Sequence, residues 1–223
     1  FGEEELVGAD VETGAVLWQH PLGRASVIFP VVSGDKVFYT TYPNRGACGV
    51  FKVGANGKTE PVWANREIMN YHVGNPVLVD GYLSGVDCAR TEYVLNDDQA
   101  STLKCVDFKT GELKWAEKKM GWAMILVADG NLLIQRENGE LILAEATPDS
   151  FKELKRAKLP EGVYWALPAL AGGRLICRNN DGKITCLQVG KLEEKKARGK
   201  VLCAECAEEE DAKAKAGGPD AAE

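Results

Sequence analysis

The sequence predicts an all-β fold made of about four repeated units, each with four short antiparallel strands. A turn motif with tryptophan occurs twice at the same internal spacing, and apolar segments with a central glycine recur along the chain. The body of the chain shows no convincing long helical period. Together these observations favour a repeat architecture over a single mixed domain.

The repeated turn motif is Asp-x-x-Thr-Gly followed by tryptophan. Its members are Asp10, Thr13, Gly14 and Trp18 in one copy, and Asp107, Thr110, Gly111 and Trp115 in the other. An Asp carboxylate accepts from N–H groups just ahead of it, a Thr hydroxyl does so more weakly, and Gly takes the left-handed conformation. We therefore expect a tight turn between the third and fourth strands of a unit. Each tryptophan, including Trp63 in the unit between, should cover the gap to the neighbouring unit.

Each unit begins with a β-hairpin that has glycine in its turn. The four hairpins are PVVSGDKVFYTT from Pro30, PVLVDGYLSGV from Pro76, ILVADGNLLIQ from Ile125 and PALAGGRLICRN from Pro168. Third strands are expected at 49–53, 102–108, 140–146 and 183–189, and fourth strands at 59–64, 112–117 and 151–157. Four short strands per ~40–50 residues are typical of a β-propeller blade.

The blade boundaries follow from these strands. We expect two strands of a partial blade at 1–20, blades at 21–66, 67–120 and 121–160, a partial blade at 161–189, and a charged Ala/Glu/Lys-rich tail at 190–223. If the two partial blades were one shared blade, its third strand would be present twice. We therefore expect these blades to belong to a larger ring, with compact four-bladed closure as the alternative. The tail is expected to be partly disordered, with some helix around 191–212.

The pattern Ala/Val-Asp-x-x-Thr-Gly-x-x-x-Trp on four-stranded units resembles the PQQ-like, quinoprotein-type β-propeller repeat over roughly residues 4–189. That family includes quinoprotein alcohol dehydrogenases and the outer-membrane-barrel assembly lipoprotein of Gram-negative bacteria. The motif reports how blades are built and is a poor guide to function. The resemblance implies a ring of about seven or eight blades. It also implies a periplasmic or other extracytoplasmic location.

The charge and hydropathy of the chain disfavour nucleic-acid binding and a membrane-spanning helix. The net charge is -6, and the body carries no Lys/Arg-rich stripe, which disfavours nucleic-acid binding. No apolar run approaches the ~20 residues that a membrane-spanning helix needs. The first residues, FGEEEL, have neither a start Met nor a signal pattern, so we expect an internal cut or a processed end. The oligomeric state does not follow from the sequence.

Two pairs of cysteines are candidates for a metal site, a redox pair or a disulfide. Cys203 and Cys206 form a C-x-x-C in the tail, which could be half a zinc site or a redox pair but fits two exposed thiols better. A two-residue turn at Asp181-Gly182 would place Cys177 opposite Cys186, where a disulfide is feasible. In the preceding blade, the same counting would place Ile134 opposite Leu143, and both are ordinary core residues. This favours Cys177 and Cys186 as two small buried hydrophobic residues and not as a disulfide.

The sequence shows no convincing set of catalytic residues, and it contains neither the G-x-S-x-G nor the H-E-x-x-H motif. Its two histidines, His20 and His72, lie after an outer strand and in a loop. In quinoprotein dehydrogenases the quinone stacks between a Trp and an adjacent-cysteine disulfide, with Ca²⁺ bound by Glu, Asn and Asp. This chain has no adjacent cysteines. We therefore expect no catalytic, metal-binding or cofactor-binding residues, and PQQ with Ca²⁺ only under the oxidoreductase alternative.

A candidate partner surface lies on the loops that join successive blades and on those between second and third strands. It comprises Phe29, Tyr71, His72, Arg90, Tyr93, Trp122, Tyr164 and Trp165. Alternatively, these aromatic residues plug the ends of the blades as core. The predicted function is a non-catalytic scaffold for a protein partner in the bacterial cell envelope. A partial or degenerate quinoprotein oxidoreductase and a carbohydrate-binding module are the alternatives.

Overall fold

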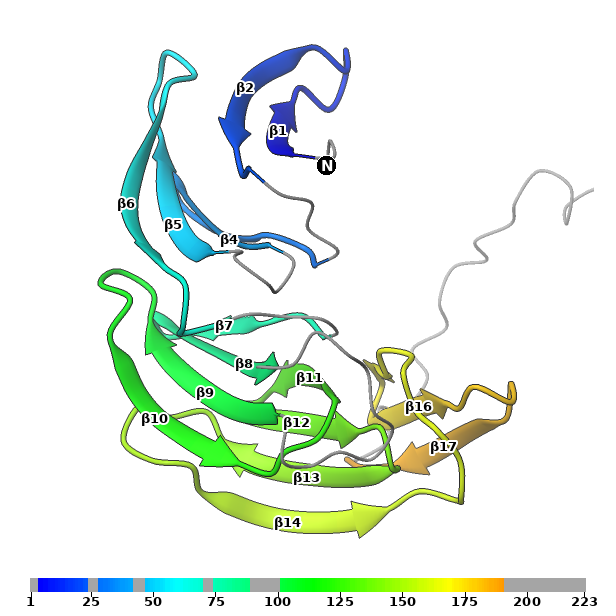
Figure 1. Ribbon diagram of the computed structural model, residues 1–223. Coiled ribbons are helices and arrows are strands. Elements are labelled where there is room, and N and C mark those ends of the chain that lie inside the picture. Colours follow the sequence, from blue (N-terminus) through cyan, green and yellow to red (C-terminus); the bar gives the residue numbers. More distant parts are fainter. Residues whose placement is uncertain (1–3, 24–27, 42–46, 70–73, 89–100, 191–223) are drawn as a thin grey trace, which may run out of the picture.

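The computed structural model describes residues 4–23, 28–41, 47–69, 74–88 and 101–190, whose strands form five antiparallel sheets (Figure 1). The first sheet contains β1 (Glu5–Ala9) and β2 (Val16–Pro21). The second contains β3 (Val31–Ser33), β4 (Lys36–Thr40), β5 (Cys48–Val53) and β6 (Thr59–Asn65). The third contains β7 (Val77–Val79), β8 (Tyr82–Cys88), β9 (Ser101–Asp107) and β10 (Leu113–Lys118). The fourth contains β11 (Ala123–Ala128), β12 (Asn131–Arg136), β13 (Glu140–Glu145) and β14 (Glu153–Lys158), and the fifth β15 (Ala169–Ala171), β16 (Arg174–Arg178) and β17 (Ile184–Gln188).

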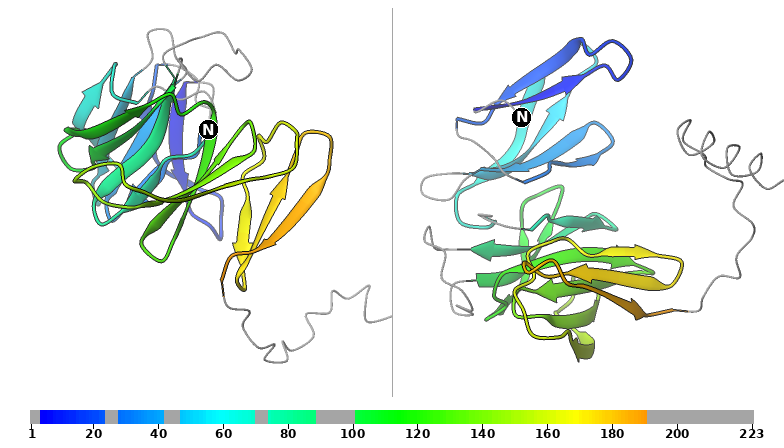
Figure 2. Two further views of the ribbon diagram at one scale, coloured as in Figure 1. Left: turned by 90° about the horizontal axis from the view of Figure 1, so that it is seen from below. Right: turned by 90° about the vertical axis from the view of Figure 1, so that its right-hand side faces the viewer.

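The sheets follow one another in chain order around an arc that the described strands do not close (Figures 1 and 2). Within every sheet, the strands pair in the order in which they occur along the chain. The fourth strands β6, β10 and β14 lie on the outer side of the arc (Figure 1). The described part of the chain contains strands and no helix, which confirms the predicted all-β architecture of four-stranded antiparallel units.

One row of cross-strand neighbours occupies the same place in every sheet, and we call it the docking row. In the second to fifth sheets, the docking row starts at the third residue pair counted from the turn between the first and second strands. In the second, third and fourth sheets, which have an outer strand, a β-bulge lies next to this row. Its members are Gly8 and Trp18 in the first sheet; Val31, Phe38, Val50 and Trp63 in the second; Val77, Ser84, Cys105 and Trp115 in the third; Leu126, Leu133, Leu143 and Lys155 in the fourth; and Ala169, Ile176 and Cys186 in the fifth.

Tryptophans of the docking row bind the next sheet along the chain. The Nε1–H of Trp63 donates to the carbonyl of Phe108 at 2.9 Å, and that of Trp115 donates to the carbonyl of Thr147 at 2.8 Å. Trp18 packs edge-on against Phe51 with ring centroids 5.6 Å apart. Each indole therefore fills a space between two sheets, and in the fourth sheet Lys155 stands in its place.

The hydrophobic core lies between neighbouring sheets rather than within one. The largest cluster joins the second, third and fourth sheets through fully buried side chains such as Phe38, Leu103 and Leu132. A second cluster, around Tyr164 and Leu175, joins the fourth and fifth sheets. A third joins the first and second sheets. Each sheet thus buries apolar side chains against its neighbours, as in other repeat proteins.

The two Asp-Thr-Gly turns share one hydrogen-bonding scheme. Asp10 Oδ1 accepts from the backbone N–H of Thr13 at 2.8 Å, and Asp107 Oδ1 accepts from that of Thr110 at 2.8 Å. Gly14 and Gly111 follow with φ of 72° and 77°. The hydrogen bonds from Thr13 to Asp10 hold the pKa of that carboxyl below its usual value. Local hydrogen bonding therefore fixes the tight turn between third and fourth strands.

The expected pairing of Cys177 with Cys186 is wrong. The backbone N–H of Asn179 donates to the carbonyl of Lys183 at 3.0 Å, so the turn is one residue longer than expected. Cys177 therefore lies opposite Thr185, and Cys186 lies opposite Ile176. The same correction applies to the preceding blade, where Ile134 lies opposite Ile142 rather than Leu143.

The two cysteines also differ in environment. Cys177 is fully buried, and burial raises the pKa of its thiol to about 11. Cys186 is an exposed free thiol. The expectation of two small buried residues therefore holds for Cys177 alone. Cys203, Cys206 and the rest of the expected tail beyond residue 190 lie outside the described residues.

Candidate functional site

The loops that lead into the inner strands β3, β11 and β15 carry Phe29, Trp122 and Trp165. Inner strands of successive propeller blades run in the same direction, so their starting ends lie on one face. The turn between β12 and β13, which contains Glu137, also lies there. We call these four residues and the loops that carry them the loop face.

Two tryptophans stack on the loop face. The rings of Trp122 and Trp165 are 6.1 Å apart and nearly parallel, with an interplanar angle of 23°. Trp165 Nε1–H donates to the carboxylate of the buried Glu137 at 3.5 Å. The amide of Gln135 donates to the carbonyl of Ala166 at 2.9 Å, which ties the same loop to β12. This loop is thus held in place by stacking and by polar contacts.

The predicted partner-surface residues divide into three groups. Phe29 is 72% exposed and Trp165 is 37% exposed, so both are accessible. Trp122 and Tyr164 are buried, which agrees for these two with the alternative that they plug the ends of the blades as core. Tyr164 lies against Gly139 and its hydroxyl donates to the carbonyl of Pro160 at 2.9 Å, so it plugs the end of the fourth sheet. The remaining four, Tyr71, His72, Arg90 and Tyr93, lie outside the described residues.

The other predicted positions lie at blade joints. Asp10, Thr13 and Gly14 and the matching Asp107, Thr110 and Gly111 form the turns described above, and Trp18, Trp63 and Trp115 form the indole contacts between sheets. His20 stacks on Phe51 at 3.8 Å, and its Nδ1 lies 3.0 Å from Thr59 Oγ1. Burial lowers the pKa of this imidazole. Its contacts are those of a packing residue.

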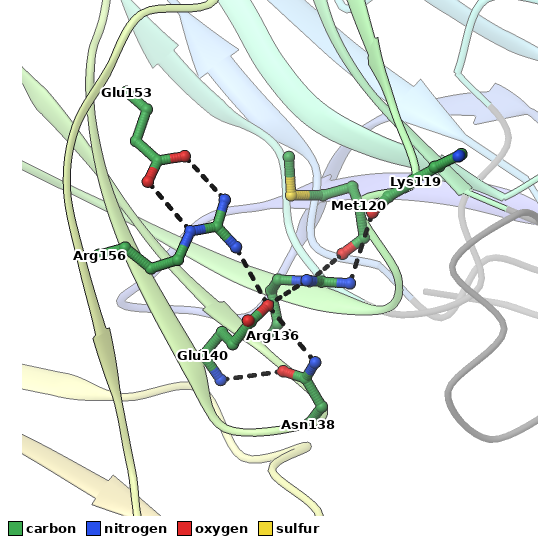
Figure 3. Close-up of polar contacts among 7 residues, drawn as sticks. All are labelled: Lys119, Met120, Arg136, Asn138, Glu140, Glu153 and Arg156. Carbon is green, nitrogen blue, oxygen red and sulfur yellow. Dashed lines mark hydrogen bonds and ion pairs between the residues drawn. The ribbon is translucent and has the colours of Figure 1, made fainter.

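A charged network beside the loop face links β12, β13 and β14 (Figure 3). The buried Arg136 donates through Nε to the carbonyl of Met120 at 2.6 Å and forms an ion pair with Glu140. Arg156 bridges Glu140 at 3.1 Å and Glu153 at 2.7 Å. Burial alone would raise the pKa of Glu140, but Arg136, Asn138 and Arg156 outweigh it and lower that pKa. The network ties the outer strand to the two strands inside it, which sequence spacing alone does not reveal.

Two further features lie at the fifth sheet, and neither is predicted by the sequence. A groove of about 600 Å³ lies between the fourth and fifth sheets, and its lining includes Leu133, Leu141, Lys155 and Arg156. The face of the fifth sheet that turns away from this groove is exposed, and Ile176 and Ile184 on it are 43% and 69% exposed. In the other sheets the corresponding face is covered by the next sheet.

Within the described ranges, no cluster of three or more His, Cys, Asp or Glu side chains could hold a metal ion. The described residues also form no helix long and apolar enough to cross a membrane.

The family model of the outer membrane protein assembly factor BamB matches residues 1–117. The chain belongs to this family. The predicted PQQ-like repeat is thereby confirmed. A comparison with curated proteins finds no significant match.

Two solved structures, Sqt1 and Ika8, share the fold at low sequence identity. Sqt1 from Saccharomyces cerevisiae is 9% identical, with a TM-score of 0.63, over 86% of this chain and 56% of that protein. The computationally designed protein Ika8 is 10% identical, with a TM-score of 0.63, over 84% of this chain and 53% of that protein. BamB from Moraxella catarrhalis is 17% identical, with a TM-score of 0.44, over 84% of this chain and 67% of that protein. The chain thus spans about half the length of Ika8 and Sqt1.

Proposed function

We propose that this chain is a non-catalytic scaffold that binds a protein partner in the bacterial cell envelope, in the assembly of outer membrane proteins. Membership of the BamB family supports the envelope and assembly parts of this proposal. The single structural observation that carries it is the loop face, where a rigidly held loop presents Trp165 and the 46% exposed Leu167. Exposed aromatic and aliphatic side chains on an ordered loop are typical anchors of protein interfaces.

Rigidity is the physical reason for choosing this face. Trp165 is fixed by the stack on Trp122 and by the hydrogen bond to Glu137, so binding through its exposed edge would cost little conformational entropy. Phe29 lies on the same face but on the second sheet, where its backbone N–H donates to Asn75 Oδ1 at 3.1 Å. A partner that contacts both would therefore span several blades.

The experiment compares binding by the wild-type chain with that by Trp165→Ser and Leu167→Ser. Detergent-solubilised envelope proteins of a Gram-negative bacterium are captured on each purified chain and quantified by mass spectrometry. We expect specific proteins to be captured by the wild type and lost at least about tenfold in both variants, which corresponds to about 1.4 kcal/mol. Val11→Ser, at a turn where Val11 is 93% exposed, is the matched control and should bind as the wild type.

Equal capture by all four chains, or no capture at concentrations where the chain is folded, would contradict the proposal. Two parallel measurements address the other functions. Saturable binding of PQQ and Ca²⁺ with a redox-active absorbance change would favour an oxidoreductase. Glycan-array binding that is lost in Trp165→Ala would favour a carbohydrate-binding module.

A further inference from the structure

The joint between the fourth and fifth sheets lacks the indole that fills the two joints before it. In the second and third sheets, Trp63 and Trp115 lie beside the bulge of the outer strand and bond across to the next sheet. In the fourth sheet this place belongs to Lys155, which lies opposite Leu143 and beside the same kind of bulge. A lysine stem is thinner than an indole ring. The groove of about 600 Å³ lies at this joint, with Lys155 in its lining.

Leucines line both walls of the groove. Leu133 and Leu141 come from the fourth sheet, and Leu170, Leu175 and Leu187 come from the fifth. Three of the five are only partly buried, so an apolar group in the groove would remove further apolar surface from water. Pockets of roughly 300–1,000 Å³ hold drug-sized ligands, so the groove has room for a side chain and for the short peptide segment that carries it.

The charged residues of the lining lie on two sides of the groove. Lys155 and Arg156 belong to the outer strand β14, and Asp129 belongs to the turn between β11 and β12 at the inner side. Arg156 is already bound to Glu140 and Glu153. Among the described residues, none forms an ion pair with Lys155. A carboxylate is therefore favoured at the outer side of the groove and disfavoured at the inner side.

The groove also offers backbone carbonyls at the place where the earlier indoles bind theirs. Phe108 and Thr147, whose carbonyls accept from the indoles, lie three and four residues after the docking-row members of β9 and β13. The same count from Cys186 on β17 reaches Val189 and Gly190, and both line the groove. An aromatic ring that carries an N–H donor therefore meets acceptors here as well as leucines.

We propose that this groove binds an acidic segment of a partner protein and takes up an aromatic side chain of that segment, with Lys155 paired to a carboxylate beside the ring. The inference deepens the proposed scaffold function and rests on it, but it concerns a surface other than the loop face. A peptide is favoured over an acyl chain for two reasons. The earlier joints hold aromatic side chains carried on a strand, and the carbonyls of the groove call for a donor that an acyl chain lacks.

Short labelled peptides test the chemistry of the occupant. Binding of fluorescein-labelled Gly-Asp-Trp-Glu-Gly amide to the full chain is measured by fluorescence anisotropy. One control peptide carries Asn and Gln in place of the two acidic residues, and the other carries Ala in place of Trp. The neutral peptide should bind about threefold more weakly, as expected for the loss of an exposed ion pair. The peptide without Trp should bind at least about tenfold more weakly, because it leaves the leucines exposed.

Two substitutions at position 155 locate the site. Lys155→Trp places an indole where the two preceding sheets have one, so it should fill the groove and weaken binding of the acidic peptide at least about tenfold. Lys155→Met keeps an unbranched stem without the charge, so it should bind the acidic and neutral peptides equally. Lys158→Trp is the matched control and should bind as the wild type, because Lys158 lies on the opposite face of β14 and does not line the groove. Circular dichroism checks that each variant is folded, and Lys155→Met decides the test if Lys155→Trp is not.

Several outcomes would overturn the proposal. They are equal affinity of the wild type for the acidic peptide and either control, undiminished binding by folded Lys155→Trp, and no binding at about 1 mM peptide. Binding of laurate and of none of the peptides would assign the groove to an acyl chain instead. Self-association of the wild type that Lys155→Trp abolishes would assign it to a second copy of this chain. Any of these results, together with envelope proteins captured through Trp165, would reject the groove and leave the scaffold function standing.

Discussion

The first three strands of the third sheet and the three strands of the fifth pair in the same order and carry the same docking row, yet the docking-row face of the third sheet is buried and that of the fifth is exposed. Cys105 in the third sheet is 1% exposed, whereas Cys186 at the same place in the fifth sheet is exposed. Cys105 lies opposite Trp115 and beneath the fourth sheet, while the described residues place no sheet over Cys186. Burial in this fold is therefore set by the neighbouring sheet and not by the sheet's own sequence. Stability should be distributed in the same way.

The largest expected effect comes from shortening one apolar side chain in each of the two sheets. Leu103→Ala removes a fully buried side chain from the third sheet and should lower the free energy of unfolding by about 2–5 kcal/mol. Ile176→Ala, at a 43% exposed position of the fifth sheet, should cost less than about 1 kcal/mol. Urea denaturation followed by tryptophan fluorescence measures both. Equal losses would show that the fifth sheet is covered in solution.

The next effect compares the two Asp-Thr-Gly turns. At Gly111 an added Cβ would lie 2.7 Å from the Trp63 ring, whereas at Gly14 it would meet nothing within 4 Å. Both residues have positive φ, so alanine should cost about 1–2 kcal/mol at either place. The clash should raise the loss in Gly111→Ala to about 2–4 kcal/mol. Similar denaturation midpoints for the two variants would show that Trp63 does not dock on this turn.

The sequence predicted the parts of this fold that depend on local chemistry. The Asp and Thr side chains, the turn glycines and the alternation of apolar residues act over a few positions, so they are visible in one repeat. The sequence left open whether Trp122 and Tyr164 are buried, because their burial depends on how neighbouring sheets meet. Trp165 of the next loop stacks on Trp122, and Tyr164 lies against Gly139 of the fourth sheet. The turn at Asn179 was misjudged by one residue because its side chain also accepts from Lys183 N–H, at 2.8 Å, and stabilises a longer turn. The groove likewise depends on how two sheets sit together.

A smaller effect should follow from removing one indole hydrogen bond between sheets. Trp115→Phe keeps an aromatic ring beside Phe151 but loses the bond to the carbonyl of Thr147. The loss of that bond should cost about 1 kcal/mol in the free energy of unfolding. Trp63→Phe should behave similarly, because its indole bonds to Phe108. Trp18→Phe is the control, since no described residue accepts from its indole N–H. A control loss as large as the other two would mean that packing and not the hydrogen bond decides the effect.

The smallest expected effect is on how the stability of the protein depends on pH, through Glu140 of the fourth sheet. The pKa of Glu140 is lowered below its ordinary value of 4.5, because Arg136, Asn138 and Arg156 outweigh the opposing effect of burial. A carboxyl with a depressed pKa in the folded state contributes stability that is present above its ordinary pKa and is lost as the pH falls through the folded value. Glu140→Gln should therefore flatten the acid limb of the stability curve below about pH 4.5, by less than about 1 kcal/mol. Glu12→Gln, at an exposed turn, is the matched control. An unchanged acid limb in Glu140→Gln would show that the ion pairs with Arg136 and Arg156 are not formed in solution.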